Sequence, residues 1–247
     1  MSTAMQLDIL AFGVHPDDVE LGCSGTLLSA IAEGKKVGIV DLTRGELGTR
    51  GTAETRDEEA SRAAALMGVS IRINLQLADG FFENNQASQL LVIQAIRRFR
   101  PQIVLCNAPD DRHPDHGRSA QLVQTAAFLS GLPKITTVYE QQEQTAFRPA
   151  YVFHYLQDKY LNPSFIVDVS AHFQQKLQAI LCYTTQFNAP ENSHEPQTYI
   201  SSPQFLETVI GRARLLGKRI GVQYAEGFIT EKMLGIQSFD AFIQNPT

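Results

Sequence analysis

The sequence predicts an α/β fold of the Rossmann-like type, in which helices cover both faces of a mainly parallel sheet and make three layers, α/β/α. Two observations predict it. Short apolar, β-branched runs alternate with helical segments along the first half of the chain, and a polar, irregular segment follows each run. With 247 residues and 43% hydrophobic content, the chain can build one large core. We expect a single domain over residues 1–247, with a C-terminal extension packed on it.

Four apolar runs in the first half should be buried strands, because they are rich in β-branched residues and bounded by polar segments. They cover residues 7–14, 37–43, 71–77 and 103–108. Helical patterns lie between them at residues 26–33, 54–67 and 87–100, and end at Gly34, at Gly68 and before Pro101. The Gly22-x-x-Gly25 spacing lacks the first glycine and the downstream acid of a dinucleotide fingerprint. It predicts close packing of a helix on a strand, and no NAD.

The second half of the chain is less regular. Apolar runs at residues 151–156 and 165–169 predict strands, and the patterns at residues 171–183 and 204–219 predict helices. The stretch 188–201 is rich in Pro, Asn, Ser and Glu, which predicts a surface loop or a lid.

Charge and cysteine content disfavour several classes of protein. The net charge is −5 at pH 7 and no long run of Lys and Arg is present, so nucleic acid is an unfavourable partner. The three cysteines are widely spaced, with no C-x-x-C pair, which argues against a disulfide framework and a thiolate metal site. The start does not resemble a signal peptide, and no apolar stretch approaches the roughly 20 residues of a membrane span. We therefore expect a cytoplasmic protein with no membrane partner.

Two similar motifs follow two of the predicted strands. The sequence HPDD at residues 15–18 comes directly after the first run, and HPDH at residues 113–116 follows the fourth. The carboxyl ends of parallel strands meet at one edge of a sheet, so both motifs should reach the same crevice. The polar segments RGELGTRG and ADGFFENN, after the second and third runs, should reach it too.

We predict that His15, Asp18 and His116 bind Zn²⁺. Imidazole and carboxylate suit this ion, and three protein ligands leave the fourth position open, as a catalytic site requires. His15 and Asp18 stand three residues apart, a spacing that lets both side chains face one point from a tight turn. A single histidine in a loop is more often a solvated side chain, but the two motifs together favour the metal site.

Asp17 should point away from the metal, because two adjacent residues in a turn do not easily face one ion. It is then free to take a proton from the attacking water as a general base. His113 lies one helical turn from His116 and should stand where the oxyanion forms. Asp115 would accept from the Nδ1–H of His113 and favour the imidazolium. The alternative for Asp115 is the N-cap of the following helix.

The same segments resemble a known family. GVHPDDVELGCSGTL and DRHPDH are similar to the LmbE-like (PIG-L) N-acetylglucosaminyl deacetylases. DLTRGELGTRGTAETRDEEA, CYTTQF and GVQYAEGF resemble the branch that makes bacillithiol and deacetylates N-acetylglucosaminyl-malate. The resemblance implies a zinc-dependent LmbE-like domain with ligands His15, Asp18 and His116, the base Asp17, and the oxyanion pair His113 and Asp115. Some relatives use a C-terminal tyrosine near the oxyanion, and neither Tyr199 nor any other tyrosine is assigned that role here.

Three arginines are candidates for contact with the substrate. The family places an arginine at the position of Arg56 against the substrate, Arg50 lies in the segment after the second strand, and Arg112 precedes the second histidine motif. A carboxylate-bearing aglycone such as malate needs a planar, bidentate cation, which arginine supplies. The alternative for Arg56 is an ion pair with Glu58 or Glu59 on a helix surface.

These observations predict a zinc-dependent hydrolase that removes the acetyl group from an N-acetylglucosaminide, with N-acetylglucosaminyl-malate as the expected substrate. One alternative is the deacetylation of another N-acetylated amino sugar or glycoconjugate. Two others are a catalytically inactive sugar-binding protein and a non-haem Fe(II) oxygenase, which also uses two histidines and one carboxylate. The extra Asp of the first motif and the alternation of strand and helix disfavour the oxygenase. Besides a small-molecule amino-sugar substrate, we expect a homo-oligomeric partner.

Overall fold

The computed structural model describes residues 5–187 and 195–242. Its centre is a seven-stranded sheet with the strand order β3-β2-β1-β4-β7-β9-β8. The first five of these strands run parallel, and β9 is antiparallel to its neighbours β7 and β8. The strands are β1 (Ile9–Gly13), β2 (Val37–Asp41), β3 (Ile71–Asn74), β4 (Ile103–Cys106), β7 (Tyr151–Tyr155), β8 (Phe165–Asp168) and β9 (Ala225–Ile229). The predicted α/β class with a mainly parallel sheet is confirmed.

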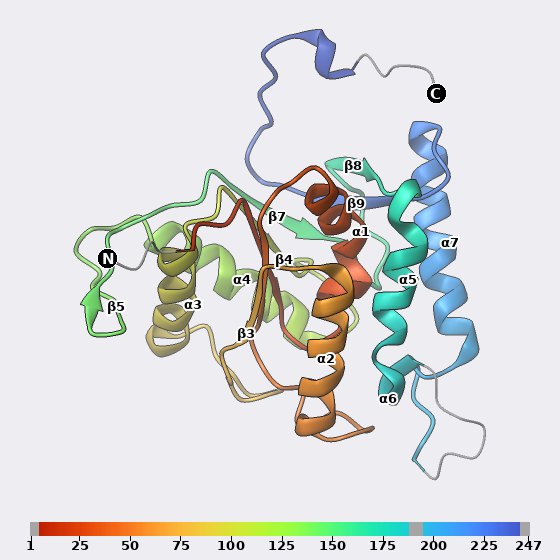
Figure 1. Ribbon diagram of the computed structural model, residues 1–247, viewed down its shortest axis with the longest axis horizontal. Coiled ribbons are helices and arrows are strands. Elements are labelled where there is room, and N and C mark those ends of the chain that lie inside the picture. Colours follow the sequence, from red (N-terminus) through yellow and green to blue (C-terminus); the bar gives the residue numbers. More distant parts are fainter. Residues whose placement is uncertain (1–4, 188–194, 243–247) are drawn as a thin grey trace.

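Helices cover both faces of the sheet (Figure 1). One face packs against α3 (Gln86–Phe99) and α4 (Pro114–Leu129), and the other against α1 (Asp18–Ala32), α2 (Ala53–Met67) and α5 (Phe173–Leu181). The remaining elements are α6 (Thr184–Phe187), α7 (Pro203–Ile220), the turns η1 (Ser170–His172) and η2 (Phe239–Phe242), and the hairpin of β5 (Val138–Tyr139) and β6 (Gln142–Glu143). None of the helices in the described part of the chain has the length and apolar character that a membrane crossing needs.

Each strand of the first half ends one to three residues before the end of its predicted run. Helix α1 begins at Asp18, eight residues before the predicted start. The prediction missed these residues because 18–25 are all buried and therefore show no amphipathic pattern. Strand β9 was not predicted, since it contains a buried Glu226 and a glycine. Of the predicted loop, residues 188–194 lie outside the described part of the chain.

Close packing explains the first glycine of the Gly22-x-x-Gly25 spacing. A Cβ atom at Gly22 would lie 2.1 Å from the ring of Tyr155, and that ring is held by a hydrogen bond from its hydroxyl to the carbonyl of Phe12 at 2.9 Å. Helix α1 therefore approaches the sheet as closely as a glycine permits, as the sequence predicted. This contact fixes the start of α1, where the first metal motif lies.

The chain reverses its direction of travel across the sheet between β1 and β4. From β1 it winds outward through β2 to β3, and α3 then returns it to β4 on the other side of β1. The two strands pair in register, with Ile9 opposite Ile103 and Ala11 opposite Leu105. Loops at such a reversal point part in opposite directions and leave a crevice at the carboxyl ends of the strands. The two histidine motifs follow these two strands.

Candidate metal centre and active site

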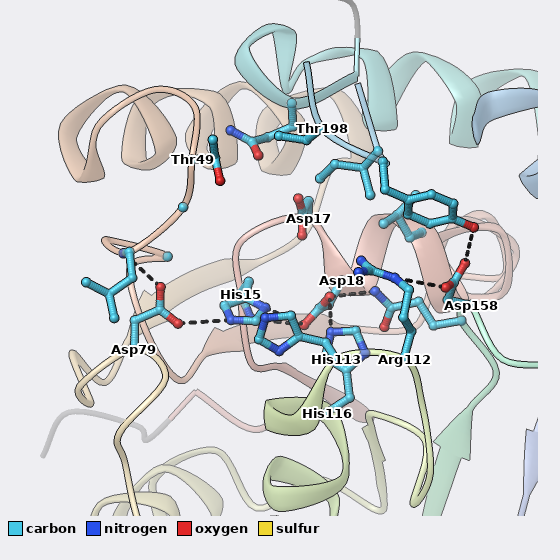
Figure 2. Close-up of a pocket in the computed structure, with 18 of the residues that line it drawn as sticks. His15, Asp17, Asp18, Thr49, Asp79, Arg112, His113, His116, Asp158 and Thr198 are labelled. Carbon is cyan, nitrogen blue, oxygen red and sulfur yellow. Dashed lines mark hydrogen bonds and ion pairs between the residues drawn. The ribbon is translucent and has the colours of Figure 1, made fainter. Parts of the chain in front are cut away.

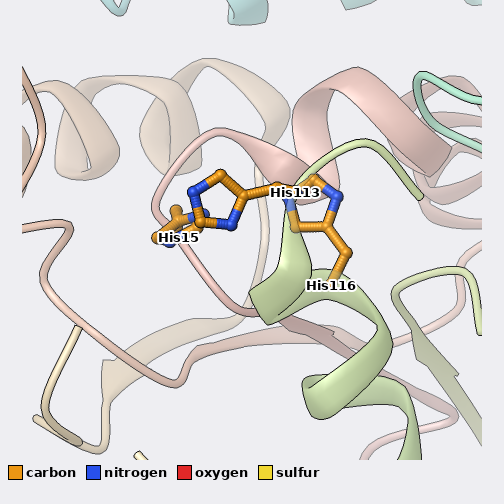
Figure 3. A group of neighbouring side chains, drawn as sticks. All are labelled: His15, His113 and His116. Atoms are coloured by element: carbon orange, nitrogen blue, oxygen red, sulfur yellow. The ribbon is translucent and has the colours of Figure 1, made fainter. Parts of the chain in front are cut away.

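Three histidine rings meet beyond the carboxyl ends of β1 and β4 (Figure 3). His15 follows β1, His113 is the N-cap of α4, and His116 lies in its first turn. The ring centroid of His113 lies 4.8 Å from that of His15 and 5.4 Å from that of His116. The rings line a cavity of about 480 Å³, together with residues of the loops after β2 and β3. The structure thus brings the two sequence motifs together.

Asp18 lies between these rings, and both of its carboxylate oxygens accept hydrogen bonds. Oδ2 accepts from the backbone N–H of His15 at 2.9 Å and from the amide of Asn107 at 3.0 Å, and Oδ1 accepts from the amide of Gln157 at 2.6 Å. Burial alone would raise the pKa of Asp18, but the charges of His116 and His15 and hydrogen bonds from these two residues hold it well below its usual value. Asp18 is therefore a buried anion.

A carboxylate stands behind each of the two predicted histidine ligands (Figure 2). Nε2 of His15 lies 3.0 Å from Asp79, and Nδ1 of His116 lies 2.6 Å from Asp111. The other ring nitrogens face Asp18, with Nδ1 of His15 at 3.8 Å from Oδ2 and Nε2 of His116 at 3.3 Å from Oδ1. Carboxylates in this position orient metal-bound histidines and increase their basicity.

The surrounding carboxylates make this cluster attractive to positive charge. Burial alone would lower the pKa of both imidazoles. The carboxylate of Asp115, 3.7 Å from Nε2 of His15, and the hydrogen bond to Asp79 instead raise the pKa of His15 to about 9. The charge of Asp18 and the hydrogen bond to Asp111 raise the pKa of His116 to about 10. The same carboxylates would attract a divalent cation that takes the place of these protons.

The donor set fits a divalent metal, and it offers more than the three predicted ligands. Ligand atoms of His15, His113 and His116 lie within 4.8 Å of one another, as do those of His15, Asp79 and Asp115. The predicted set of His15, Asp18 and His116 has the oriented nitrogens and the ionised carboxylate that Zn²⁺ prefers. His113 is close enough to serve as a third imidazole ligand, so its assignment to the oxyanion stays a prediction.

Asp17 is placed to handle a proton. It lines the cavity beside Asp18, is 5% exposed, and has a φ of 127°, which few residues other than glycine adopt. Burial raises its pKa to about 7, although Nη1 of Arg56 lies 3.6 Å from Oδ2 and opposes this shift. A carboxyl group that titrates near neutral pH can both accept and return a proton, as the predicted general base must.

The predicted contact between His113 and Asp115 is not formed. Nδ1 of His113 accepts a hydrogen bond from the backbone N–H of Asp115 at 3.3 Å, so His113 itself caps helix α4. Burial and the nearby charges of His15 and His116 lower the pKa of His113, which favours the neutral ring with its proton on Nε2. The carboxylate of Asp115 instead accepts from the backbone of Gly80 at 2.9 Å and from Arg118 at 2.8 Å. The expected hydrogen bond from Nδ1–H of His113 to Asp115 and the alternative of Asp115 as the N-cap are both corrected. The charge of Asp115 does favour the imidazolium, but burial and the two neighbouring histidines outweigh it.

The three predicted substrate arginines differ in position. Arg112 lines the cavity and donates to Asp158 at 3.1 Å. Arg56 also lines it, but its terminal nitrogens already donate to the carbonyl of Pro16 at 2.9 Å and to Gln186 at 2.7 Å. Arg56 therefore braces the loop that carries Asp17, and forms neither the surface ion pair with Glu58 or Glu59 nor a free bidentate fork.

The predicted contact of Arg50 with the substrate is corrected by its position. It is 3% exposed and donates to the backbone carbonyls of Thr185, Glu195 and Pro196. It is not among the residues that line the cavity. Arg50 thus ties the loop after β2 to Thr185, Glu195 and Pro196 and joins parts of the wall rather than facing the cavity.

Several residues of the site were missed in the sequence. They are Asp79, Asp111, Asn107, Gln157 and Arg212, all of which hold a motif residue or line the cavity. A signal was available for some of them, since Asp79 stands in the polar segment after the third predicted strand and Asp111 closely precedes the second motif. Asn107 was included in the fourth predicted strand, but β4 ends one residue before it. Gln157 and Arg212 lie in the second half of the chain, and only the tertiary structure brings them here.

Comparison with known proteins agrees with this geometry. The family model described as PIG-L, GlcNAc-PI de-N-acetylase, matches residues 10–127, which include both histidine motifs. The crystal structure of the conserved protein TT1542 from Thermus thermophilus is 37% identical, with a TM-score of 0.83 over 94% of this chain and 98% of that one. This chain belongs to the PIG-L family. Its predicted membership is confirmed.

Other relatives bear names that describe deacetylation. Diacetylchitobiose deacetylase from Thermococcus kodakarensis is 29% identical over 89% of this chain and 81% of its own length. The structure of N,N'-diacetylchitobiose deacetylase from Pyrococcus horikoshii is 25% identical, with a TM-score of 0.75 over 89% of this chain and 82% of that one. A more distant relative, at 23% identity over 70% of this chain and 78% of its own length, is the probable N-acetyl-alpha-D-glucosaminyl L-malate deacetylase 2 from Bacillus anthracis.

Proposed function

We propose that this PIG-L family protein is a zinc-dependent hydrolase that removes the acetyl group from an N-acetylated amino sugar. One observation carries the proposal most directly. A buried carboxylate, Asp17, lines the same cavity as a cluster of oriented imidazoles and the ionised Asp18. A carboxylate base beside a metal-ligand set is an arrangement suited to metal-assisted amide hydrolysis.

The ligands in this proposal are His15, Asp18 and His116. A bound Zn²⁺ would supply a Lewis acid, which polarises an acyl carbonyl and makes water more acidic. Nitrogen and oxygen donors without thiolate are compatible with this ion. Asp79 and Asp111 orient the two imidazoles, and this arrangement is typical of metal-bound histidines.

The side chains of the site divide the remaining work. Asp17 takes a proton from the water that attacks the acetamide carbon, and later gives it to the amine nitrogen as the C–N bond breaks, so acetate and a free amine leave. The neutral ring of His113 donates its Nε2–H to the oxygen on which negative charge develops. Arg56 holds Asp17 through its contact at 3.6 Å and its hydrogen bond to Pro16.

The substrate class rests on the relatives and the shape of the site. Two relatives are named for diacetylchitobiose and one for a malate glycoside, and all three names describe an acetylated glucosamine. The cavity, of about 480 Å³, can hold a sugar and part of its aglycone. Among these substrates we propose N-acetylglucosaminyl-malate, because several segments of the sequence resemble the bacillithiol branch of the family. We also keep the cytoplasmic location and the homo-oligomer as proposals from the sequence.

A small panel of substrates tests this proposal. Zinc-loaded protein is incubated with diacetylchitobiose, N-acetylglucosaminyl-malate and methyl N-acetylglucosaminide, and mass spectrometry measures loss of an acetyl group. We expect hydrolysis of at least one, its loss on chelation and its return with zinc. Asp17→Asn, which lacks the proposed base, serves as the negative control. If zinc-loaded protein left all three substrates intact, the proposed function would be wrong.

A further inference from the structure

One cationic side chain in the cavity has no partner among the described residues. Arg212, on helix α7, lines the cavity and is partly buried. In the described part of the chain it makes no hydrogen bond and no ion pair within 4.0 Å, and its buried Nη1 is unsatisfied. Burial lowers the pKa of Arg212, and Asp158 and Asp111 oppose this shift only from beyond ion-pair distance. A guanidinium nitrogen that is buried without a hydrogen-bond partner costs free energy, which a bound ligand would offset.

Each of the other two arginines of the cavity has a carboxylate within 4.0 Å. Arg56 lies 3.6 Å from Asp17, and Arg112 donates to Oδ2 of Asp158 at 3.1 Å. The second oxygen of Asp158 accepts from the hydroxyl of Tyr199 at 3.0 Å. Both oxygens of Asp158 thus already accept hydrogen bonds. Within residues 5–187 and 195–242 no carboxylate lies within ion-pair distance of Arg212, although the charges of Asp158 and Asp111 act on it from farther away.

This wall lies away from the apolar rim of the cavity. Figure 2 shows Arg112 and Asp158 on one side of the histidines and Asp79 on the other. Next to Asp79, whose carboxylate accepts from the backbone of Leu47, the rim carries the exposed side chains of Leu47 and Phe81. With the acetamide at the histidines and Asp17, the two walls offer the rest of the substrate an apolar surface and a cationic one.

We propose that Arg212 binds an oxyanionic group, a carboxylate or a phosphate, on the aglycone of the amino-sugar substrate. This inference rests on the proposed function and adds to it the residue that binds the aglycone. A neutral hydroxyl would accept one N–H of Arg212 but would leave its charge unpaired. An oxyanion accepts two N–H groups of the planar guanidinium and also balances the charge. Arg112, stacked 4.7 Å over the ring of Tyr199, borders the same place.

Matched variants and substrates test this assignment. kcat/KM is measured for wild type, Arg212→Gln, Arg212→Lys and Arg219→Gln on methyl N-acetylglucosaminide, N-acetylglucosamine 1-phosphate and N-acetylglucosaminyl-malate. We expect Arg212→Gln to lose roughly tenfold to hundredfold on an anionic substrate and to stay within about twofold on the neutral one. The loss falls on the 1-phosphate if the group is a phosphate and on malate if it is a carboxylate. Arg212→Lys keeps the charge without the fork and should lose less.

Arg219→Gln is the control for charge, because Arg219 lies exposed in the last turn of the same helix and does not line the cavity. It should behave like wild type on all three substrates. Equal losses of Arg212→Gln on neutral and anionic substrates would overturn the assignment, and so would a wild type without preference for either anionic substrate.

A binding measurement separates this inference from the proposed function. Titration calorimetry with glucosaminyl-malate and with glucosamine 1-phosphate, the deacetylated products, reports anion binding without any turnover. We expect Arg212→Gln to weaken the binding of one of them by about tenfold or more, and Arg219→Gln to leave both unchanged. Unchanged affinity in Arg212→Gln would refute the anion site even if every substrate is hydrolysed. Failure of hydrolysis with the binding loss intact would refute only the deacetylase.

Discussion

Asp17 combines three features at one residue: a left-handed backbone, near-complete burial and contact with one cation. The φ of 127° and the pKa of about 7 both arise in the turn between β1 and α1. Backbone strain of this kind costs free energy and persists only where surrounding contacts impose it. Arg56 supplies one such contact, through its hydrogen bond to the carbonyl of Pro16. The strain aims the carboxylate into the cavity while its neighbour Asp18 faces the histidines.

Replacing Asp17 by Asn should separate the base from the ligands. We expect the variant to retain its metal and to lose about 10²-fold or more in kcat, because only proton transfer is removed. Elemental analysis and steady-state kinetics on the same preparation check both parts. If Asp17→Asn lost its metal and regained activity in excess zinc, Asp17 would be a ligand.

The carboxylates behind the histidines give a second test. Asp79→Asn and Asp111→Asn should each weaken metal affinity by about tenfold to hundredfold, because an amide neither orients the imidazole nor increases its basicity as well. Asp110→Asn is the matched control, since Asp110 pairs with Lys159 at the surface next to Asp111. Competition with a metal-binding dye measures the affinities. Equal affinities in all three variants would contradict the orienting role.

The pKa directions predict how metal binding depends on pH. His15 and His116, with pKa values of about 9 and about 10, carry protons at neutral pH and must lose them to bind a metal. We therefore expect about two protons to be released per metal at pH 7, and metal affinity to rise with pH up to about 9 to 10. Calorimetry in buffers of different ionisation enthalpy counts the protons. Metal binding without proton release at pH 7 would mean that these rings are already neutral.

At the scale of helices and strands, what could be predicted depended on local pattern. The strands of the first half and helices α2 and α3 have apolar runs or caps that are visible in sequence, and the spacing within HPDD and HPDH placed the predicted metal ligands near one point. The prediction made helix α1 too short because the buried start of this helix has no polar face. Asp79 and Arg212 reach the cavity from loops and helices distant in sequence, and no local pattern specifies such contacts. The order of the strands decides them.

The contact between α1 and the sheet can be tested by a pair of glycine substitutions. Gly22→Ala should destabilise the protein by about 1–3 kcal/mol, because the new Cβ would lie 2.1 Å from the ring of Tyr155. Gly211→Ala, in helix α7, meets nothing within 4 Å and should be neutral or stabilise by up to about 1 kcal/mol. Urea unfolding of both variants gives the two values. A Gly22→Ala protein as stable as wild type would show that α1 can move away from the sheet.

At the scale of the whole molecule, the reversal point between β1 and β4 determines where chemistry occurs. It brings two motifs about a hundred residues apart in sequence to adjacent strands, and the second half of the chain closes the crevice with Gln157, Tyr199 and Arg212. In this account the first half supplies the metal ligands and the base, and the second half supplies the wall that meets the aglycone. The expected homo-oligomer stays a prediction, which light scattering can check.

A zinc titration of metal-free protein tests the central claim most directly, with acetate release from an N-acetylglucosaminide as the readout. The metal-free protein should be inactive, and the rate should rise linearly and level off at about one zinc per chain. His15→Ala and Asp18→Asn should need far more zinc to reach a much lower rate. Full acetate release by the metal-free protein, or a zinc-saturated wild type that releases none, would contradict the assignment of a zinc-dependent deacetylase to this site.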